Sequence, residues 1–273
     1  MATTTTTLDD LFNNIIVEAQ FTAQENSIMR NLVRQYDVAG AVGNVVQVPV
    51  YGTLTLEDGT EGSALNGSDM ASTSVTIPMA EKAAMTLLTD DAIETIPSQN
   101  LAADMGRVMG EQMASAYDAA AMLKFANFKA ANDIDATAGL TTADLFKAAA
   151  LLRAEKASGN LVGVFHPIAL YNLKQAIANT GSLGALSNVG NAALESGLVG
   201  QIAGITIFES TNAATGGVFA LDALGGAMKR DVRIETERDA ASRASKLVGS
   251  SVFGFEAIRP EFGVNIATTN VFA

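Results

Sequence analysis

Apolar residues near the start of the chain recur with the period of a helix. Between residues 8 and 36 they fall at spacings of three and four, and Asp9 and Asp10 occupy what would be the first turn. Carboxylates there interact favourably with the helix dipole. We therefore predict a helix over 8–36, preceded by a flexible threonine-rich arm at 3–7.

Two short segments alternate with the period of a strand and predict a hairpin. Residues 45–51 and 74–79 are rich in valine, threonine and isoleucine, and each contains a proline, which favours a sheet edge. The connection, residues 52–73, is rich in glycine, serine, threonine and acids and contains no lysine. A loop this long within a compact domain is a functional projection or disordered. Its four large apolar residues, which could dock on another molecule, are Leu54, Leu56, Leu65 and Met70.

A second extended run, 80–93, leads to the clearest helix, predicted from an N-cap at Asn100 to Asn127. It would be about 40 Å long, at 1.5 Å per residue. Asp118 is placed with the polar residues, away from the buried stripe. The predicted stripe consists of Leu101, Met105, Val108, Met109, Met113, Ala116, Ala120 and Leu123.

The remaining chain alternates helix and strand and then becomes rich in strands. This pattern predicts a mixed α/β region followed by a returning sheet. We expect Gly225 and Gly226 to interrupt the secondary structure at a break between strands. The predicted helices are 143–156 and 167–178, and the predicted strands are 161–166, 202–208, 217–221, 232–235 and 252–258.

Composition indicates a subunit whose surface is partly covered by other copies. Hydrophobic residues make up 48% of the 273 residues and charged residues only 17%, which is low for a monomer with a fully wet surface. The formal net charge of −12 argues against nucleic-acid recognition. The absence of cysteine excludes disulfides and thiolate chemistry. No signal peptide and no membrane-spanning run is expected.

Candidate chemistry is sparse, so we predict no catalytic, cofactor or metal site. His166 is the one histidine, and its place between a strand and Pro167 favours a structural role. Acidic clusters at 90–94 and 231–239 lack the spacing of a calcium loop, and no glycine loop has a phosphate-binding pattern. An α/β enzyme or ligand-binding protein built around His166 is an open alternative, but it would need a convergent polar pocket.

The order of elements resembles the tailed-bacteriophage major capsid proteins, which share the Hong Kong 97-type fold. Three sequence segments support the resemblance: Val164–Pro167 followed by Tyr171–Leu173, then Gly225–Glu235, and finally Phe253–Val264. The resemblance covers nearly the whole chain and implies an α+β fold. Its parts would be an N-terminal arm (1–43), an extended hairpin loop (44–79), a peripheral domain (80–139) with a spine helix (100–127), an axial α/β domain (140–228), and C-terminal strands returning to the peripheral domain (229–273).

The resemblance also implies a function. The chain would be a non-enzymatic subunit that forms hexamers and pentamers of an icosahedral head around double-stranded DNA, in the virion, after assembly in the host cytoplasm. Implied partners are a portal protein, a scaffolding protein and a cement or decoration protein, with DNA held without sequence-specific binding, no cofactor and no membrane. Many relatives carry a long charged scaffolding segment before the arm, so here we expect a separate scaffolding protein or a segment that has been removed. The lysine-free segment 52–73 argues against a Lys-to-Asn crosslink from the hairpin. A surface-layer protein, or another self-assembling shell or filament subunit, is the alternative.

The hairpin is expected to reach over a neighbouring copy, because residues 45–79 look unable to satisfy themselves within one molecule. Its acidic side chains would meet basic ones of the partner. An acidic inner wall would repel packaged DNA. The predicted intersubunit residues are Leu54, Leu56, Glu57, Asp58, Glu61, Leu65, Asp69 and Met70 on the hairpin, and Arg230, Arg233, Arg238 and Arg243 near the C-terminus.

Overall fold

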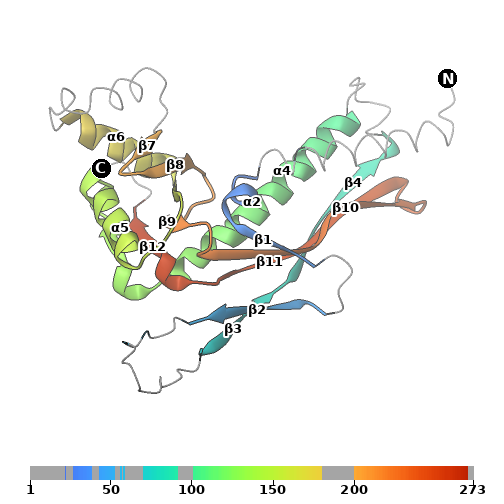
Figure 1. The fold of residues 1–273 in the computed structure, drawn as a ribbon. Helices are drawn as coiled ribbons and strands as arrows, with labels where there is room; N and C mark the ends of the chain where they lie inside the picture. The colour runs from blue at the N-terminus through green and yellow to red at the C-terminus, as the bar shows by residue number, and fades with distance from the viewer. Residues whose placement is uncertain are drawn as a thin grey trace.

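The computed structural model of the chain describes residues 22, 27–38, 43–52, 56, 58, 70–91, 101–179 and 200–269. Within these residues the fold is α+β, with three sheets and one long helix (Figure 1). A six-stranded sheet lies at one end of the molecule, a four-stranded sheet extends away from it, and a two-stranded hairpin leaves the lower edge.

The four-stranded sheet has the order β1-β10-β11-β4. Its centre is the long antiparallel pair β10 (Leu224–Asp239) and β11 (Ala244–Ala257), with β4 (Ala80–Thr89) antiparallel on one side and β1 (Arg34–Asp37) parallel on the other. The extended run predicted after residue 80 is thus confirmed as β4. The predicted break at Gly225–Gly226 is wrong, because both glycines lie inside β10.

The helix predicted over 8–36 is wrong in its last part. Helix α2 covers only Met29–Leu32, and the next residues form strand β1; residues 8–21 lie outside the described residues. Tertiary pairing overrides the helical period here. The glycines of β10 let β1 come close, since a Cβ on Gly225 would lie 3.0 Å from the Tyr36 ring.

The six-stranded sheet has the order β5-β12-β9-β6-β8-β7, and helices α5 (Thr142–Ala154) and α6 (Pro167–Asn179) accompany it. Helix α5 begins with a capping box, in which the Thr141 and Asp144 side chains each bind the other's backbone N–H. This confirms the predicted alternation of helix and strand. The strands are β5 (Ile134–Ala136), β6 (Leu161–Phe165), β7 (Gln201–Ile202), β8 (Ile205–Glu209), β9 (Gly216–Ala220) and β12 (Gly263–Thr268).

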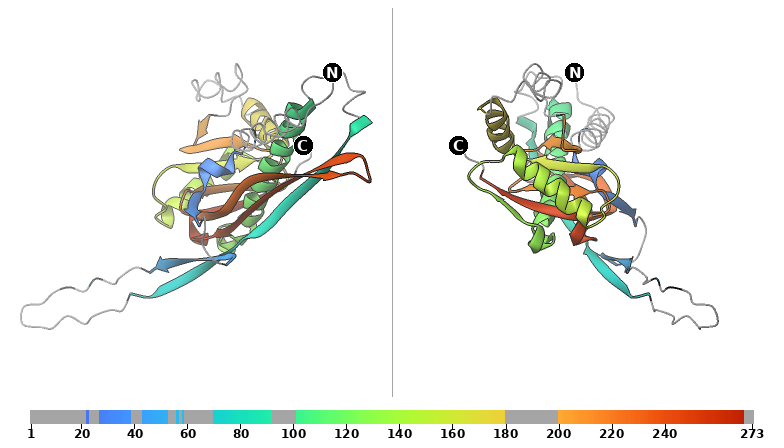
Figure 2. Two further views of the ribbon diagram at one scale, coloured as in Figure 1. Left: turned by 90° about the vertical axis from the view of Figure 1, so that its right-hand side faces the viewer. Right: turned by 60° about the vertical axis from the view of Figure 1, so that its left-hand side comes forward.

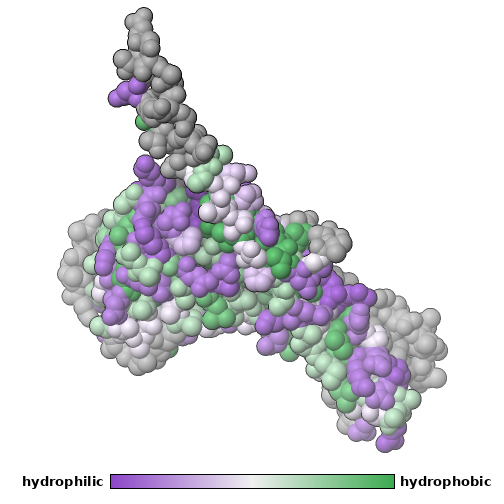
Figure 3. All heavy atoms as spheres, turned by 90° about the horizontal axis from the view of Figure 1, so that it is seen from below, coloured by the Kyte–Doolittle hydropathy of each residue, from purple (hydrophilic) through white to green (hydrophobic). Residues whose placement is uncertain are grey.

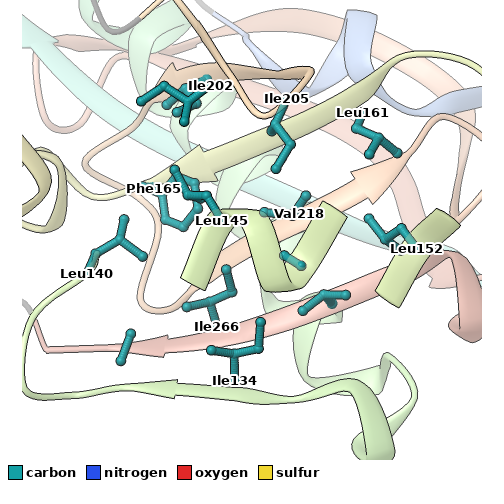
Figure 4. Packing of buried hydrophobic residues seen from close by; sticks show 14 of the residues in the cluster. Ile134, Leu140, Leu145, Leu152, Leu161, Phe165, Ile202, Ile205, Val218 and Ile266 are labelled. Atoms are coloured by element: carbon teal, nitrogen blue, oxygen red, sulfur yellow. The ribbon is translucent and has the colours of Figure 1, made fainter. Parts of the chain in front are cut away.

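The core of this end lies between helix α5 and the six-stranded sheet, as Figure 4 shows. Leu145 and Leu152 of α5 are completely buried, as are Leu161 and Phe165 of β6. Strands β5 and β12 share this sheet, although the sequence assigned them to the peripheral domain and the C-terminal segment. The division of the chain into domains remains a prediction.

The long helix α4 (Leu101–Met122) confirms the predicted spine, and its last residues continue as the 3-10 helix η1 (Leu123–Asn127). Two shorter 3-10 helices follow later, η2 (Ala130–Asn132) and η4 (Pro260–Phe262). The predicted buried stripe is correct at Met109 and Met113 but wrong at Val108 and Leu123, which are 57% and 69% exposed. The remaining buried positions of the helix are Gly106, Gly110, Ala114, Tyr117, Asp118, Ala121 and Met122.

An aromatic cluster joins the spine helix to both sheets. Tyr117 of α4 contacts Phe253 and Phe255 of β11, with ring centroids 5.0 and 4.7 Å apart. The ring centroids of Phe125 in η1 and Phe219 in β9 of the other sheet are 5.4 Å apart. These contacts hold the two parts of the molecule in one arrangement, because aromatic rings pack with specific geometry as well as burying large areas.

Candidate intersubunit interface

Strands β2 (Val45–Tyr51) and β3 (Ser72–Pro78) form the predicted antiparallel hairpin. They pair from Val45 opposite Pro78 to Tyr51 opposite Ser72, and Gly52 N–H donates to the Ala71 carbonyl at 2.9 Å. Figure 2 shows both strands projecting from the lower edge of the body. The two strands therefore satisfy each other's backbone along their shared edge, and no other described strand pairs with either of them.

The base of the hairpin packs on its own chain. Ile77 is completely buried, and Val48 and Met79 are nearly so. The expectation that residues 45–79 cannot be satisfied within one molecule is therefore wrong for this part, because alternate side chains of β2 and β3 complete a small core beside β10 and β11. This core consists of Val48, Ile77, Met79, Ala227, Val252 and Ile258.

A glycine on β11 allows the chain to pass from β3 to β4 at very close range. A Cβ atom on Gly254 would lie 2.0 Å from the Pro78 carbonyl oxygen and 2.8 Å from its carbonyl carbon. One residue away, Phe253 pairs with Ala80 at the start of β4. The backbone contact at Gly254 thus sets the place where the hairpin leaves the four-stranded sheet.

The outer part of the hairpin carries apolar side chains that its own chain does not cover. Leu56 is 94% exposed, Tyr51 55% and Met70 50%, and Asp58 is also exposed. The structure thus places three of the eight predicted hairpin residues (Leu56, Asp58 and Met70) at exposed positions. The other five, Leu54, Glu57, Glu61, Leu65 and Asp69, lie outside the described residues.

The predicted arginines are largely engaged within their own chain. Arg238 binds both carboxylate oxygens of Asp90 at 2.6 Å, and Arg230 pairs with Glu81, so that both tie β10 to the ends of β4. Hydrogen bonding to Arg238 lowers the pKa of Asp90. Contact of these side chains with a second copy remains a prediction.

The other two predicted arginines lie near the same pair of strands. Arg233 contacts Glu235 at 2.7 Å on the exposed surface, and Arg243 has φ +46° in the turn between β10 and β11. Beside that turn, Lys246 of β11 pairs with Asp239, the last residue of β10, at 2.9 Å, and its hydrogen bond lowers the pKa of Asp239 to about 2. The turn is therefore fixed by internal charge pairs.

Strand β4 presents an apolar strip that sequence reasoning missed. Met85 is 66% exposed and Leu87 47%, and both point away from the face that buries Leu88. The alternation of Met85 and Leu87 with smaller residues was the available signal. Over the face seen in Figure 3, apolar residues are scattered among polar ones. Scattered apolar residues are normal on a protein surface, so the feature of note on β4 is the exposed pair Met85 and Leu87, which share one face of the strand.

A groove of about 590 Å³ lies between the base of the hairpin and the body. Its walls come from segments far apart in the sequence: β1, β2, the end of α5, the turn after β9 and the residues around η4. The lining combines cations, aromatic rings and aliphatic side chains. The charged and aromatic lining residues are Arg34, Tyr36, Tyr51, Lys156, Asp222, Arg259 and Phe262.

The segment before β1 is attached to the spine helix by a buried carboxylate. Asp118, 3% exposed, accepts from Ser27 Oγ at 2.8 Å, from Ile28 N–H at 3.0 Å and from Met29 N–H at 3.0 Å. Burial raises the pKa of Asp118, although these three bonds act against the shift. The prediction that Asp118 lies off the buried stripe is wrong, since the helix turns it inward to receive these donors.

Little in the described residues suggests reaction chemistry. His166 Nδ1 accepts from Ile168 N–H at 3.3 Å, which places the imidazole at the start of α6, and its structural role remains a prediction. The described part of the chain contains no group of three or more histidine or carboxylate side chains that could hold a metal ion. None of its helices is long and apolar enough to cross a membrane.

Comparison by sequence gives no match, neither to a protein-family profile nor to a curated protein. Comparison by structure gives many. The capsid of cyanophage P-SCSP1u superposes with a TM-score of 0.72 at 18% identity, covering 90% of this chain and 89% of that one. A protein of Mycobacterium phage Che8 reaches 0.68 at 21% identity, covering 90% and 92%.

A more distant solved structure shares the same architecture. The virus-like particle from Pyrococcus furiosus gives a TM-score of 0.63 at 11% identity and covers 93% of this chain and 98% of that one. In these three structures the match takes in nearly all of both chains, so no large part of either fold lacks a counterpart. The prediction of fold is therefore confirmed: this chain has the Hong Kong 97-type fold of tailed-phage capsid proteins.

Proposed function

We propose that the chain is the major capsid protein of a tailed phage. Copies would assemble as hexamers and pentamers into the icosahedral head that encloses the double-stranded DNA genome, after synthesis in the host cytoplasm. The observation that carries the proposal is the whole-length match to the capsid of cyanophage P-SCSP1u, at 90% and 89% coverage of the two chains. The exposed apolar side chains of the hairpin and β4 support it, because they suit contacts between copies.

The shell would be a structural assembly with no catalytic role for its subunit. Its proposed partners are further copies of the chain, a portal protein, a separate scaffolding protein and a cement or decoration protein. Packaged DNA would lie inside without sequence-specific contacts, which the net charge of −12 favours. We also propose that the chain is divided into arm, hairpin, peripheral domain and axial domain, and that these parts make the contacts between copies.

The intersubunit contacts would lie on the hairpin and on the outer face of the four-stranded sheet. Leu56 and Met70 supply apolar contact, and Asp58 supplies charge. Arg230, Arg233 and Arg238 would contribute from positions already fixed by ion pairs within the subunit, so that little side-chain entropy is lost on assembly, and Arg243 would contribute from the turn between β10 and β11. A surface-layer or filament subunit is the second candidate, but no described feature favours it over a closed shell.

Electron microscopy of the purified protein tests the proposal directly. Closed icosahedral particles are expected. Flat sheets or filaments would favour the alternative subunit, and a stable monomer or dimer at all concentrations would exclude a shell protein that assembles by itself. Co-expression with candidate scaffolding proteins from the same genome is the control for a subunit that requires one.

Shortening the hairpin should abolish assembly without unfolding the subunit. Residues 53–70 are replaced by Asn-Gly, which closes the ladder between Gly52 and Ala71, whose backbones are already hydrogen-bonded. We expect thermal unfolding close to that of the wild type, because the packed base of the hairpin is kept, and a loss of closed particles in sedimentation and microscopy. An unchanged yield of particles would contradict the role given to the hairpin.

A further inference from the structure

The groove at the base of the hairpin has an excess of positive charge that its own chain does not neutralise. Three of its lining side chains are cationic (Arg34, Lys156 and Arg259) and one is a carboxylate (Asp222). That carboxylate already pairs with Arg34 at 3.0 Å. Among the described residues, Lys156 and Arg259 have no ion-pair partner. The groove therefore offers two cations to an incoming anion.

Aromatic rings make the same groove suited to apolar side chains. The Arg34 guanidinium lies over the Tyr36 ring at 5.8 Å, and that of Arg259 lies over Phe262 at 5.3 Å. Such stacking holds the arginine planes in place, and because Arg34 already donates to Asp222, the Arg259 guanidinium is the one whose donors can receive an incoming carboxylate. Tyr51, more than half exposed, adds a further apolar wall. A peptide that combines acidic and aliphatic residues has the matching chemistry.

The chain itself contains such a peptide in residues 52–73. This segment has four acids (Glu57, Asp58, Glu61 and Asp69) and neither lysine nor arginine. Its described residues are uncovered, since Leu56 is 94% exposed and Asp58 is also exposed. Leu56 and Asp58 therefore do not lie in the groove of their own molecule.

We propose that the groove binds the acidic segment 52–73 of a second copy of the chain. The inference rests on the proposed function and names the surface that receives the hairpin. A space of about 590 Å³ holds only a few side chains. We therefore assign the contact to residues 56–58, with Leu56 against the aromatic walls and the carboxylates of Glu57 and Asp58 facing Lys156 and Arg259.

Charge reversal on each side tests the pairing in the full-length protein. One variant reverses the groove (Lys156→Glu with Arg259→Glu), and another reverses the segment (Glu57→Lys with Asp58→Lys). Each variant alone places like charges at every junction, so the yield of closed particles should fall by about tenfold or more. A charge-matched control, Lys147→Glu with Arg153→Glu, changes exposed positions of α5 outside the groove and should assemble like the wild type.

Bringing the two reversed surfaces together, in one chain or in a mixture, should restore assembly. A chain carrying all four substitutions has complementary charges at every junction, and its particles would show that none of them prevents folding. An equimolar mixture of the two reversed variants can alternate around a hexamer, where each reversed groove meets a reversed segment and each natural groove a natural one. A ring of five cannot alternate and keeps one like-charged junction, so we expect closed particles from the four-substitution chain and, from the mixture, hexamers that neither variant forms alone, both detected by microscopy and sedimentation.

Each of the other outcomes of these experiments would contradict one part of the proposal. Assembly of either reversed variant at the wild-type level would exclude the groove, as would failure of both the four-substitution chain and the mixture. Particles from the four-substitution chain without hexamers from the mixture would mean that the segment binds within its own molecule. Absence of particles from the wild-type protein, with or without scaffolding, would instead reject the proposed function.

Discussion

A Gly254→Ala variant is expected to lose about 3 kcal/mol of unfolding free energy, near the upper end for overpacking substitutions. The added Cβ would lie 2.0 Å from the Pro78 carbonyl oxygen, and the atoms in its way are backbone, which cannot rotate aside. Relief requires the junction of β3 and β4 to move away from β11. The measurement is denaturant unfolding, with the midpoint and slope compared with those of the wild type.

The matched control is the same substitution five residues earlier on the same strand. A Cβ on Gly249 would meet the methyl ends of Met109 and Met113 at 3.0 and 3.4 Å, and methionine side chains can adjust. We expect Gly249→Ala to cost less than about 1 kcal/mol. Equal losses at the two glycines would mean that the close approach of Pro78 is not what limits position 254.

The Gly254→Ala change should also affect assembly more than its cost in stability explains. The hairpin is attached at this junction, and its base packs against Val252 of the same strand. Moving the junction redirects the hairpin relative to the body, and an intersubunit contact on the hairpin would then be misplaced. We expect few or misshapen particles from protein that is still folded at the assembly temperature.

Elements whose residues are close in sequence could be predicted from the sequence. Helix α4 and the hairpin of β2 and β3 have strong local patterns, and both were predicted within a few residues. The order of these elements was also enough to predict the fold. Local patterns succeed here because the tertiary contacts reinforce the local preference.

Elements that depend on distant partners were missed. Residues 34–36 follow a helical period, yet they form a strand because the edge of β10, about 190 residues later, is open to them. Asp118 looks like a solvent-facing residue until its donors are known, and these lie about 90 residues earlier. Neither pairing leaves a trace in the sequence around its own position.

The candidate interface was predictable only in part. The exposed apolar residues of the hairpin could be inferred because residues 52–73 lack the means to form a core. The groove could not, since its lining side chains come from five separate segments that only the fold brings together. The arginines were predicted to contact a second copy, which remains a prediction, and their pairing with Glu81 and Asp90 of their own chain was not foreseen.

The second large effect is expected from Asp118→Ala, which should lower the free energy of unfolding by about 3–5 kcal/mol. Alanine leaves three donors without an acceptor: Ser27 Oγ and the backbone N–H groups of Ile28 and Met29. Ser27 and Met29 are buried, so water cannot easily replace the lost bonds there. An open pocket lined by Ile28 and Asp118 can supply water to the Ile28 N–H group. The lower end of the expected range applies if that water fully replaces the lost hydrogen bond.

Two further variants separate the loss of the acceptor from the loss of charge. Asp118→Asn keeps one oxygen for Ser27 and Met29 but turns an amide donor toward Ile28 N–H, so we expect about half the loss seen with alanine. Glu111→Ala removes an exposed carboxylate from the same helix and should cost less than about 0.5 kcal/mol. Hydrogen exchange at residues 27–38 locates the effect: opening of this segment at a lower free energy than the rest of the chain is expected in Asp118→Ala. If protection there stayed at the wild-type level, the buried carboxylate would not be what attaches the segment to the spine helix.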